Sequence, residues 1–138
     1  MKGARVEFSV PYCVATALLR GRVFFDDFRE EWIRDQAVLR LMSTVVLQRD
    51  PDLDRVYPHT WRAVVTIETT RGNRHDARVD YPTGDPKNPM TEEELIAKFH
   101  GLTGHIIPEA SRSLLIERCL TLEKLDNARL LFKGIDLA

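Results

Sequence analysis

The sequence predicts an α+β fold in which a small antiparallel sheet packs with helices in a two-layer domain. Residues 61–70 and 75–81 alternate in the way typical of strands, and a tight turn separates them. Helical patterns lie before and after these strands and do not alternate with them, which favours an α+β layer pair over a parallel sheet. A third short run, at 44–48, makes the expected sheet about three-stranded.

The bulk composition is that of an ordinary globular protein. The 138 residues fit a single domain, 1–138, and 43% hydrophobic with 30% charged residues predicts a real core. A net charge of −1 gives no support to nucleic-acid binding. No apolar run approaches the roughly 20 residues that span a bilayer, and no signal region is evident at the N-terminus. We therefore expect a cytoplasmic protein without a membrane segment.

The first predicted helix covers residues 8–21. Ser9 is a suitable cap, Pro11 is tolerated in the first turn, and Gly21 stands where helices often end. One stripe is expected to face the core; it comprises Val10, Cys13, Val14, Ala17 and Leu18. The other side has aromatic, small and hydroxyl residues in place of charges, namely Tyr12, Ala15, Thr16 and Leu19. We expect that side to meet a partner domain, a ligand, or both.

The next stretch predicts short helical turns at 23–35 that point aromatic side chains inward. Asp35 is the expected cap of a helix over 36–42. The β-branched run 44–48 predicts the third strand. The acids Asp50, Asp52 and Asp54 resemble the start of a calcium loop, but the glycine and glutamate that such a loop needs are missing, so we predict a turn with solvated acids.

The hairpin is followed by a shaped loop and helices. Residues 71–73 form its turn, and 82–89 contain three prolines and a glycine that cannot continue a sheet. Thr91 and Glu94 predict a capping box at a helix start, with Leu95, Phe99 and Leu102 inward. A further helix is expected to begin at Pro108, and a last one to be capped by Asp126 and to end at Gly134. Both cysteines, Cys13 and Cys119, fall on apolar stripes and are expected to be buried free thiols.

Common catalytic and metal motifs are missing. The four histidines form no metal-binding spacing and the two cysteines no CxxC pair, so no metal site is predicted. Phosphate-binding loops and GxSxG are also lacking. The paired acids fit helix starts and solvated faces. Tyr12 remains: its pattern favours a packed core tyrosine, while a pocket-lining position would let it donate a hydrogen bond or relay a proton.

Three stretches resemble the C-terminal part of the MmgE/PrpD family, which includes 2-methylcitrate dehydratase, cis-aconitate decarboxylase and iminodisuccinate epimerase. These stretches are FSVPYCVATALLRG (8–21), the hairpin and loop TIETTRGNRHDARVDYPTGDPKNPMT (66–91), and EEELIAKF (92–99). The resemblance implies a larger enzyme with a helical domain and an α+β lid that enclose the active site. This chain then corresponds to a truncated lid that lacks one family strand, and residues 106–138 would return to the helical domain.

The resemblance also implies site residues and a chemistry. Catalysis in the family needs no metal or organic cofactor, and most of its proton-handling residues belong to the part that is absent here. Tyr12 matches a substrate-contacting, proton-handling tyrosine. Ser9 and the loop residues Gly84, Asp85 and Lys87 are expected to border the same cleft, whereas Lys98 looks structural. Phe8 stands where family members have His or Phe, which leaves the substrate open.

We therefore expect the lid of a cofactor-independent lyase that acts on small di- or tricarboxylic acids, by analogy with the carbon–oxygen lyase 2-methylcitrate dehydratase of propionate metabolism. Alone it should be inactive, because one tyrosine cannot supply both the proton acceptor and the anion clamp. A different interpretation is a non-catalytic binding or assembly module, or one half of a split enzyme that docks on a helical subunit. Self-association through the bare sheet edge is a third.

Overall fold

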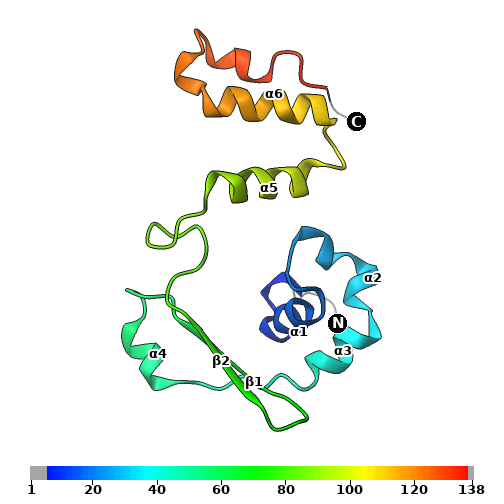
Figure 1. Ribbon diagram of the computed structural model, residues 1–138, viewed down its shortest axis with the longest axis vertical. Helices are drawn as coiled ribbons and strands as arrows, with labels where there is room; N and C mark the ends of the chain where they lie inside the picture. The colour runs from blue at the N-terminus through cyan, green and yellow to red at the C-terminus, as the bar shows by residue number, and fades with distance from the viewer. Residues whose placement is uncertain (1–5, 137–138) are drawn as a thin grey trace. The chain divides into compact units, whose positions relative to one another are not determined.

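A computed structural model describes residues 6–136. The chain divides after Pro51 into two compact units, Met1–Pro51 and Asp52–Ala138. The described residues are about 51% helical and 11% strand, and they contain six α-helices and a two-stranded antiparallel sheet (Figure 1). The predicted α+β class with a small antiparallel sheet is confirmed. No described helix is both long and apolar enough to cross a bilayer.

The first unit is built around α1, Val10–Arg20. The Ser9 hydroxyl accepts a hydrogen bond from the Tyr12 backbone N–H at 3.4 Å, and Pro11 lies in the first turn. Gly21 ends the helix with a φ of 73°, a left-handed conformation that glycine adopts without steric cost. Both predicted helix ends are confirmed.

The predicted inward stripe of α1 is wrong. Tyr12, Ala15 and Thr16 are buried, whereas Val10 is 53% exposed and Leu18 is also exposed. The buried side packs on α3, Gln36–Met42, through residues that include Val38. Both sides of α1 are largely uncharged, so periodicity could not choose between them; α3 packs on the side that offers alanine and threonine.

The remaining parts of this unit are short. After η1, Val6–Phe8, and α1, the predicted turns are confirmed as η2, Phe25–Phe28, and α2, Glu30–Ile33. Asp35 caps α3 as predicted, because its Oδ1 accepts from the N–H groups of Ala37 and Val38 at 2.7 and 3.1 Å. Phe28 and Trp32 are partly buried, but Phe25 is exposed, against expectation.

The third predicted strand does not form. Residues 45–50 have no regular structure, and Val46 in this run is 75% exposed. A β-branched run becomes a strand only when another strand offers hydrogen bonds, and within residues 6–136 β1 and β2 pair only with each other. Asp52 and Asp54 lie in α4, Pro51–Val56, so the predicted turn is also wrong at these two acids.

The hairpin consists of β1, Ala63–Glu68, and β2, Arg74–Val79, and confirms two of the predicted strands. Their register pairs Ala63 with Val79 and Ile67 with His75. The Thr69 N–H donates to the Asn73 carbonyl at 2.8 Å across the turn, where Gly72 has a φ of 81°. All strand residues except Ile67 are exposed.

Helix α5, Glu92–Thr103, begins at the predicted capping box. The Glu94 N–H donates to the Thr91 hydroxyl at 3.2 Å, and the Thr91 N–H donates to the Glu94 carboxylate at 2.8 Å. The inward direction predicted for Leu95 and Leu102 is wrong, because both are exposed. Local capping bonds therefore define where α5 starts, although little packs against it.

The C-terminal segment contains α6, Glu109–Leu120, followed by η3, Leu122–Lys124, and η4, Ala128–Phe132. Pro108 precedes α6 as predicted. Asn127, not the predicted Asp126, caps η4, because its side chain reaches the Arg129 N–H at 2.9 Å. Arg118 fastens the end of the chain to α6 by donating to the carbonyls of Leu131 and Lys133 at 3.1 and 2.6 Å.

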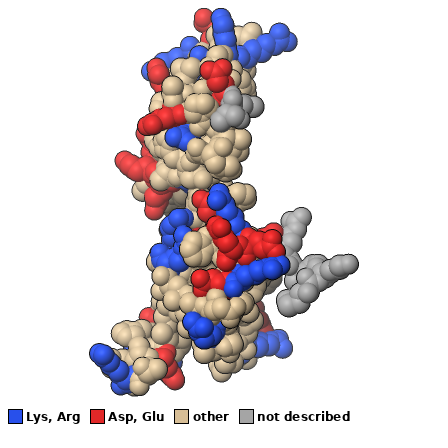
Figure 2. Space-filling model, turned by 90° about the vertical axis from the view of Figure 1, so that its right-hand side faces the viewer, with Lys and Arg blue, Asp and Glu red and all other residues tan. Residues whose placement is uncertain are grey.

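The core is smaller than the composition predicts. The buried hydrophobic residues among those described are Tyr12, Ala15, Val38 and Leu115. Cys13 is half-buried, but Cys119 is exposed, so its predicted burial is wrong; both are free thiols. Acidic and basic side chains are interspersed on the face shown in Figure 2, in keeping with the net charge of −1.

Candidate functional site

Tyr12, the leading candidate residue from the sequence, lies in the buried part of the first unit. Its side chain is 1% exposed, and its ring lies 5.8 Å from the Phe28 ring, centroid to centroid. The Tyr12 hydroxyl donates a hydrogen bond to the backbone carbonyl of Asp27 in η2. The phenol is thus fully enclosed, and its proton is already engaged by the protein.

Asp27 makes this arrangement rigid. Its carboxylate is fully buried, accepts from the Phe24 N–H at 2.7 Å, and forms an ion pair with Arg20 at 2.7 Å. The Arg20 guanidinium lies over the Trp32 ring, 3.9 Å from its centroid. We call Tyr12, Arg20, Asp27 and Trp32 the Tyr12 cluster. A buried carboxylate that is both paired and hydrogen-bonded is strongly held, and here it fixes η2 against α1.

The Tyr12 cluster favours a neutral phenol. Burial raises the pKa of Tyr12 above its ordinary value; a hydrogen bond with the Thr16 side chain opposes this rise, and the Asp27 charge adds to it. Ser9, predicted to border the cleft, instead supplies the helix cap on the Tyr12 backbone. In this conformation both residues serve the packing of the first unit.

The other predicted residues lie together in the loop 82–89 of the second unit. Asp85 and Asn88 form a small antiparallel bridge, in which the Gly84 N–H donates to the Asn88 carbonyl at 2.8 Å. Gly84 has a φ of 94°, which favours glycine. The Asp85 carboxylate accepts from the Lys87 N–H at 2.8 Å. Gly84, Asp85 and Lys87 are therefore brought together by the shape of the loop.

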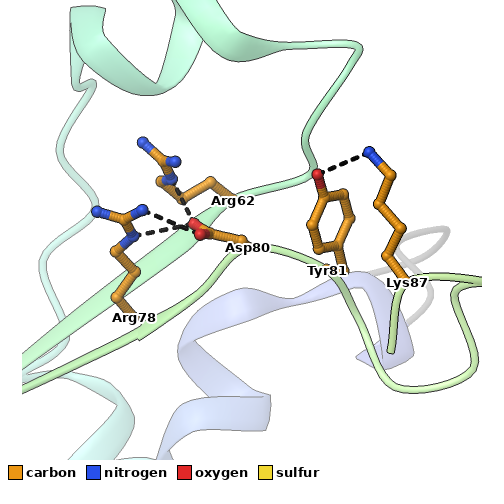
Figure 3. A network of polar contacts seen from close by, with 5 residues as sticks. All are labelled: Arg62, Arg78, Asp80, Tyr81 and Lys87. Atoms are coloured by element: carbon orange, nitrogen blue, oxygen red, sulfur yellow. Dashed lines mark hydrogen bonds and ion pairs between the residues drawn. The ribbon is translucent and has the colours of Figure 1, made fainter. Parts of the chain in front are cut away.

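This loop turns Lys87 towards Tyr81 (Figure 3). The Lys87 ammonium donates to the Tyr81 hydroxyl at 2.9 Å, and the Asn88 side chain donates to the Tyr81 backbone carbonyl at 3.0 Å. Hydrogen bonds from Lys87 and, second, from Thr60 lower the pKa of Tyr81. The same contact with Tyr81 raises the pKa of Lys87. The pair therefore favours the charged form of both groups.

Beside Tyr81, two arginines share one carboxylate (Figure 3). The Arg78 guanidinium donates two hydrogen bonds of 2.9 Å each to the Asp80 carboxylate, and Arg62 donates to the same carboxylate at 2.5 Å. The hydrogen bonds from Arg78 and then Arg62 hold the pKa of Asp80 well below its usual range. This fork ties the two strands together at the end of the hairpin nearest the loop.

The surface of the second unit is hollowed near the hairpin and near the loop 82–89. The hollow near the hairpin, of about 250 Å³, is lined by Leu53, Asp54, Tyr57, Thr60, Trp61 and Arg62. The hollow near the loop, of about 570 Å³, lies between the loop and α5 and is lined by Thr83, Gly84, Asp85, Pro86, Pro89, Met90, Leu95 and Lys98. Gly84 and Asp85 thus line the same hollow as Lys98 of α5.

Sequence reasoning missed the most tightly bonded groups. Asp27 and Arg20 are seven positions apart, and nothing in the pattern of acids distinguished the buried Asp27 from its neighbour Asp26. Tyr81 was assigned only to the end of a strand. Its position six residues before Lys87, across a loop rich in proline and glycine, was the available signal. Residues 6–136 contain no group of three or more His, Cys, Asp or Glu side chains that could hold a metal ion.

A family model described as the MmgE/PrpD C-terminal domain matches residues 1–122. The chain belongs to the MmgE/PrpD family. The match to the MmgE/PrpD domain covers the first unit and most of the second. It includes the Tyr12 cluster, the hairpin and the Tyr81–Lys87 pair, and it ends at the start of η3. No curated protein matches the chain significantly. The MmgE/PrpD assignment therefore rests on the domain model together with the motifs.

Proposed function

We propose that the chain is the C-terminal lid of a cofactor-independent lyase that acts on small di- or tricarboxylic acids, of the 2-methylcitrate dehydratase type. The observation that carries this proposal is the MmgE/PrpD match over residues 1–122. The proposed enzyme is a carbon–oxygen lyase of propionate metabolism. We propose that it works in the cytoplasm, because free thiols such as Cys13 and Cys119 are usual in that reducing compartment.

In this proposal Tyr12 contacts the substrate and handles a proton. Because its hydroxyl is enclosed and donates to the Asp27 carbonyl, η2 must move before a substrate can reach it. The high pKa that burial gives Tyr12 suits a proton donor at neutral pH. Arg20 and Asp27 are then the hinge contacts that such a movement has to disturb.

The loop residues are proposed to hold the carboxylates of the acid. Gly84 and Asp85 line the hollow of about 570 Å³ together with Lys98 of α5, and Lys87 lies in the same loop as Gly84 and Asp85. Ammonium groups bind carboxylates through charge-assisted hydrogen bonds. Lys87 is thus the cation that the loop offers, on a backbone shape that the Asp85–Asn88 bridge keeps fixed. We propose Ser9 as a cleft-bordering residue that acts through its cap on α1.

Turnover assays test this function. The chain is incubated with 2-methylcitrate or cis-aconitate, alone and together with a separately expressed helical domain of an MmgE/PrpD protein. We expect no turnover alone and measurable turnover from the pair. Tyr12→Phe should reduce the rate of the pair by at least about 100-fold, the usual contribution of a proton-transferring side chain. Tyr57→Phe is the matched control, and turnover by the isolated chain contradicts the proposed inactivity.

A binding or assembly module is the second candidate, and the exposed surface supports it. Apolar side chains of both units are exposed, among them Leu19 at 49%, Val64 at 45% and Val79 at 49%. Exposed apolar side chains that lie together are typical of surfaces that bind a partner.

Size-exclusion chromatography with light scattering separates these possibilities. A stable complex with a helical domain supports the docked lid, and a concentration-dependent dimer of the chain supports homo-oligomer formation through the hairpin. The substitution Val64→Lys, on the hairpin, should weaken the dimer. It should leave the complex with the helical domain intact if the dimer and that complex use different surfaces of the chain. A monomer that binds nothing over a wide concentration range contradicts the module.

A further inference from the structure

The Tyr81 hydroxyl makes contacts that influence its ionisation. Its oxygen accepts a hydrogen bond from the Lys87 ammonium at 2.9 Å, and this bond, with a smaller contribution from the Thr60 side chain, lowers the pKa of Tyr81. The ammonium also lies 4.7 Å from the centroid of the Tyr81 ring. Figure 3 shows the two side chains pointing towards each other from the end of the hairpin and from the loop.

These contacts fix what the Tyr81 hydroxyl can do. A phenol oxygen has one proton to donate and lone pairs that accept. Because the Lys87 ammonium has no lone pair and can only donate to it, the proton of the Tyr81 hydroxyl is directed to another group. When that proton leaves, the phenolate stays next to the positive charge and the N–H donor of Lys87, which favours the ionised form.

The loop 82–89 is shaped to maintain this contact. The Asp85 carboxylate accepts from the Lys87 N–H, and the Asn88 side chain holds the Tyr81 carbonyl at 3.0 Å, so both ends of the pair are fastened to one turn. Two prolines flank the lysine within the loop, at positions 86 and 89. An ordinary surface lysine points into solvent, whereas Lys87 is held against Tyr81 by the hydrogen bonds of the loop.

We propose that Tyr81 is a second proton-handling residue of this domain, with Lys87 as the cation that both supports its phenolate and contacts a carboxylate of the substrate. The substrate class is the small polycarboxylate of the proposed function, on which this inference rests. In the transfer, Tyr81 gives up or takes one proton at its oxygen. The pair changes between a net charge of +1 and zero, and the proton passes to or from the bound acid.

The surroundings of Tyr81 agree with this role. Lys87 and Thr60 lower the pKa of Tyr81, and the negative charge of Asp80 opposes them by a smaller amount. Asp80 is itself occupied by Arg62 and Arg78. Thr60 and Arg62 also line the hollow of about 250 Å³ in the same unit.

Absorbance titration of the phenols near 295 nm tests the pair in the intact chain, without turnover. The chain has three tyrosines, and Tyr81 is expected to ionise at the lowest pH. Tyr81→Phe should remove that first transition. Lys87→Met should move it up by about one pH unit or more, since a neighbouring opposite charge shifts a pKa by that amount. Lys87→Arg, which retains the charge, should largely preserve it.

Tyr57→Phe is the matched control, because Tyr57 is in the same unit and exposed. It should leave the first transition in place. If Tyr57→Phe removes that transition, or if Lys87→Met leaves it unmoved, Tyr81 has no special ionisation and the inference is overturned. Far-ultraviolet circular dichroism of each variant identifies any that fails to fold, and for such a variant Lys87→Arg and Tyr57→Phe still decide the result.

Citrate, a tricarboxylate probe, tests the contact with the substrate. A carboxylate bound at Lys87 offsets the ammonium charge, so saturating citrate should raise the pH of the first transition in the native chain and not in Lys87→Met. Acetate at the same carboxylate concentration should do less. No shift with citrate overturns the substrate contact. These readings do not depend on turnover, so a failed lyase assay with a normal titration rejects the proposed reaction and leaves the Tyr81–Lys87 pair standing.

Discussion

Tyr12 and Tyr81 are the same side chain in opposite surroundings. Tyr12 is enclosed in the first unit, where burial raises its pKa and its proton is bonded to a backbone carbonyl. Tyr81 lies at the end of the hairpin in the second unit, where Lys87 and Thr60 lower its pKa. The difference shows that a tyrosine within a family motif is not necessarily the tyrosine whose surroundings favour ionisation. The motif points to Tyr12, whereas the local charges and hydrogen bonds favour Tyr81.

The two units differ in the same way. The first holds its parts together with a buried ion pair and a small apolar cluster formed by α1 and α3. The second has mostly exposed strands and relies on the Asp80 fork, the loop bridge and helix caps. We therefore expect core substitutions to act mainly on the first unit, and surface charge or pH to act mainly on the second.

The largest expected effect is that of Asp27→Ala. It leaves Arg20 without its partner, removes the acceptor of the Phe24 N–H, and should lower the free energy of unfolding of the first unit by about 3 kcal/mol. Urea unfolding followed by Trp32 fluorescence, in a Trp61→Phe background, measures this change. Asp26→Ala removes only a more exposed ion pair with Arg29 and should cost less than about 1 kcal/mol. Equal losses of stability from the two substitutions would show that the buried ion pair of the Tyr12 cluster stabilises the first unit no more than an exposed one does.

Tyr12→Phe should have the next largest effect on stability. It retains the ring and leaves the Asp27 carbonyl without its donor, which costs about 1–2 kcal/mol for a buried group. The same urea experiment gives the value. Tyr57 is 59% exposed, so Tyr57→Phe should change stability by less than about 0.5 kcal/mol. A stabilising Tyr12→Phe would mean that its hydroxyl is retained at the expense of packing, as expected for a group kept for chemistry alone.

The helix caps offer a matched pair across the two units. Asp35→Ala and Thr91→Ala each remove side-chain acceptors at a helix start and should each cost about 1 kcal/mol. Amide hydrogen exchange should accelerate in α3 for the first and in α5 for the second. Helix α6, which has its own start at Pro108, is the internal reference. Faster exchange throughout the chain would show that the units unfold together.

The smallest expected effect is the acid response of the hairpin. The pKa of Asp80 is lowered by Arg78 and Arg62, and that of Asp76 by Arg74 and Thr66. A lowered pKa means that these contacts stabilise the hairpin fully above the ordinary carboxyl pKa of about 3.9 and lose that contribution as the pH falls below it. Backbone NMR shifts of β1 and β2 should therefore move towards unfolded values in acid. Asp80→Asn should flatten this pH dependence.

Signals that depend on neighbouring residues could be predicted from the sequence. Ser9, Asp35 and Thr91 were identified as caps, and the hairpin with its turn was identified from alternation and glycine. Each of these features needs only side chains and backbone groups within a few positions. They define where elements start and end, which is most of the fold.

Features that depend on tertiary contact could not be predicted. Both sides of α1 are largely uncharged, so only α3 determines that Tyr12 and not Val10 is buried. Asp27 is buried where it forms its ion pair with Arg20. In the part of the chain that the structure describes, β1 and β2 pair with each other and the run 44–48 pairs with no strand. At the candidate site, nothing in the sequence connects Lys87 with Tyr81. That connection depends on the detailed path of the loop.

The two cysteines make the chain easy to label at one place. Cys119 is exposed on α6, whereas Cys13 is half-buried on α1 and its burial raises the pKa of its thiol. Alkylating reagents attack the thiolate, so a maleimide dye at neutral pH should react with Cys119 first. A fluorophore attached there sits on a helix that contains neither of the two tyrosines. Motion and docking of the domain can then be followed by fluorescence without disturbing the groups proposed to exchange protons.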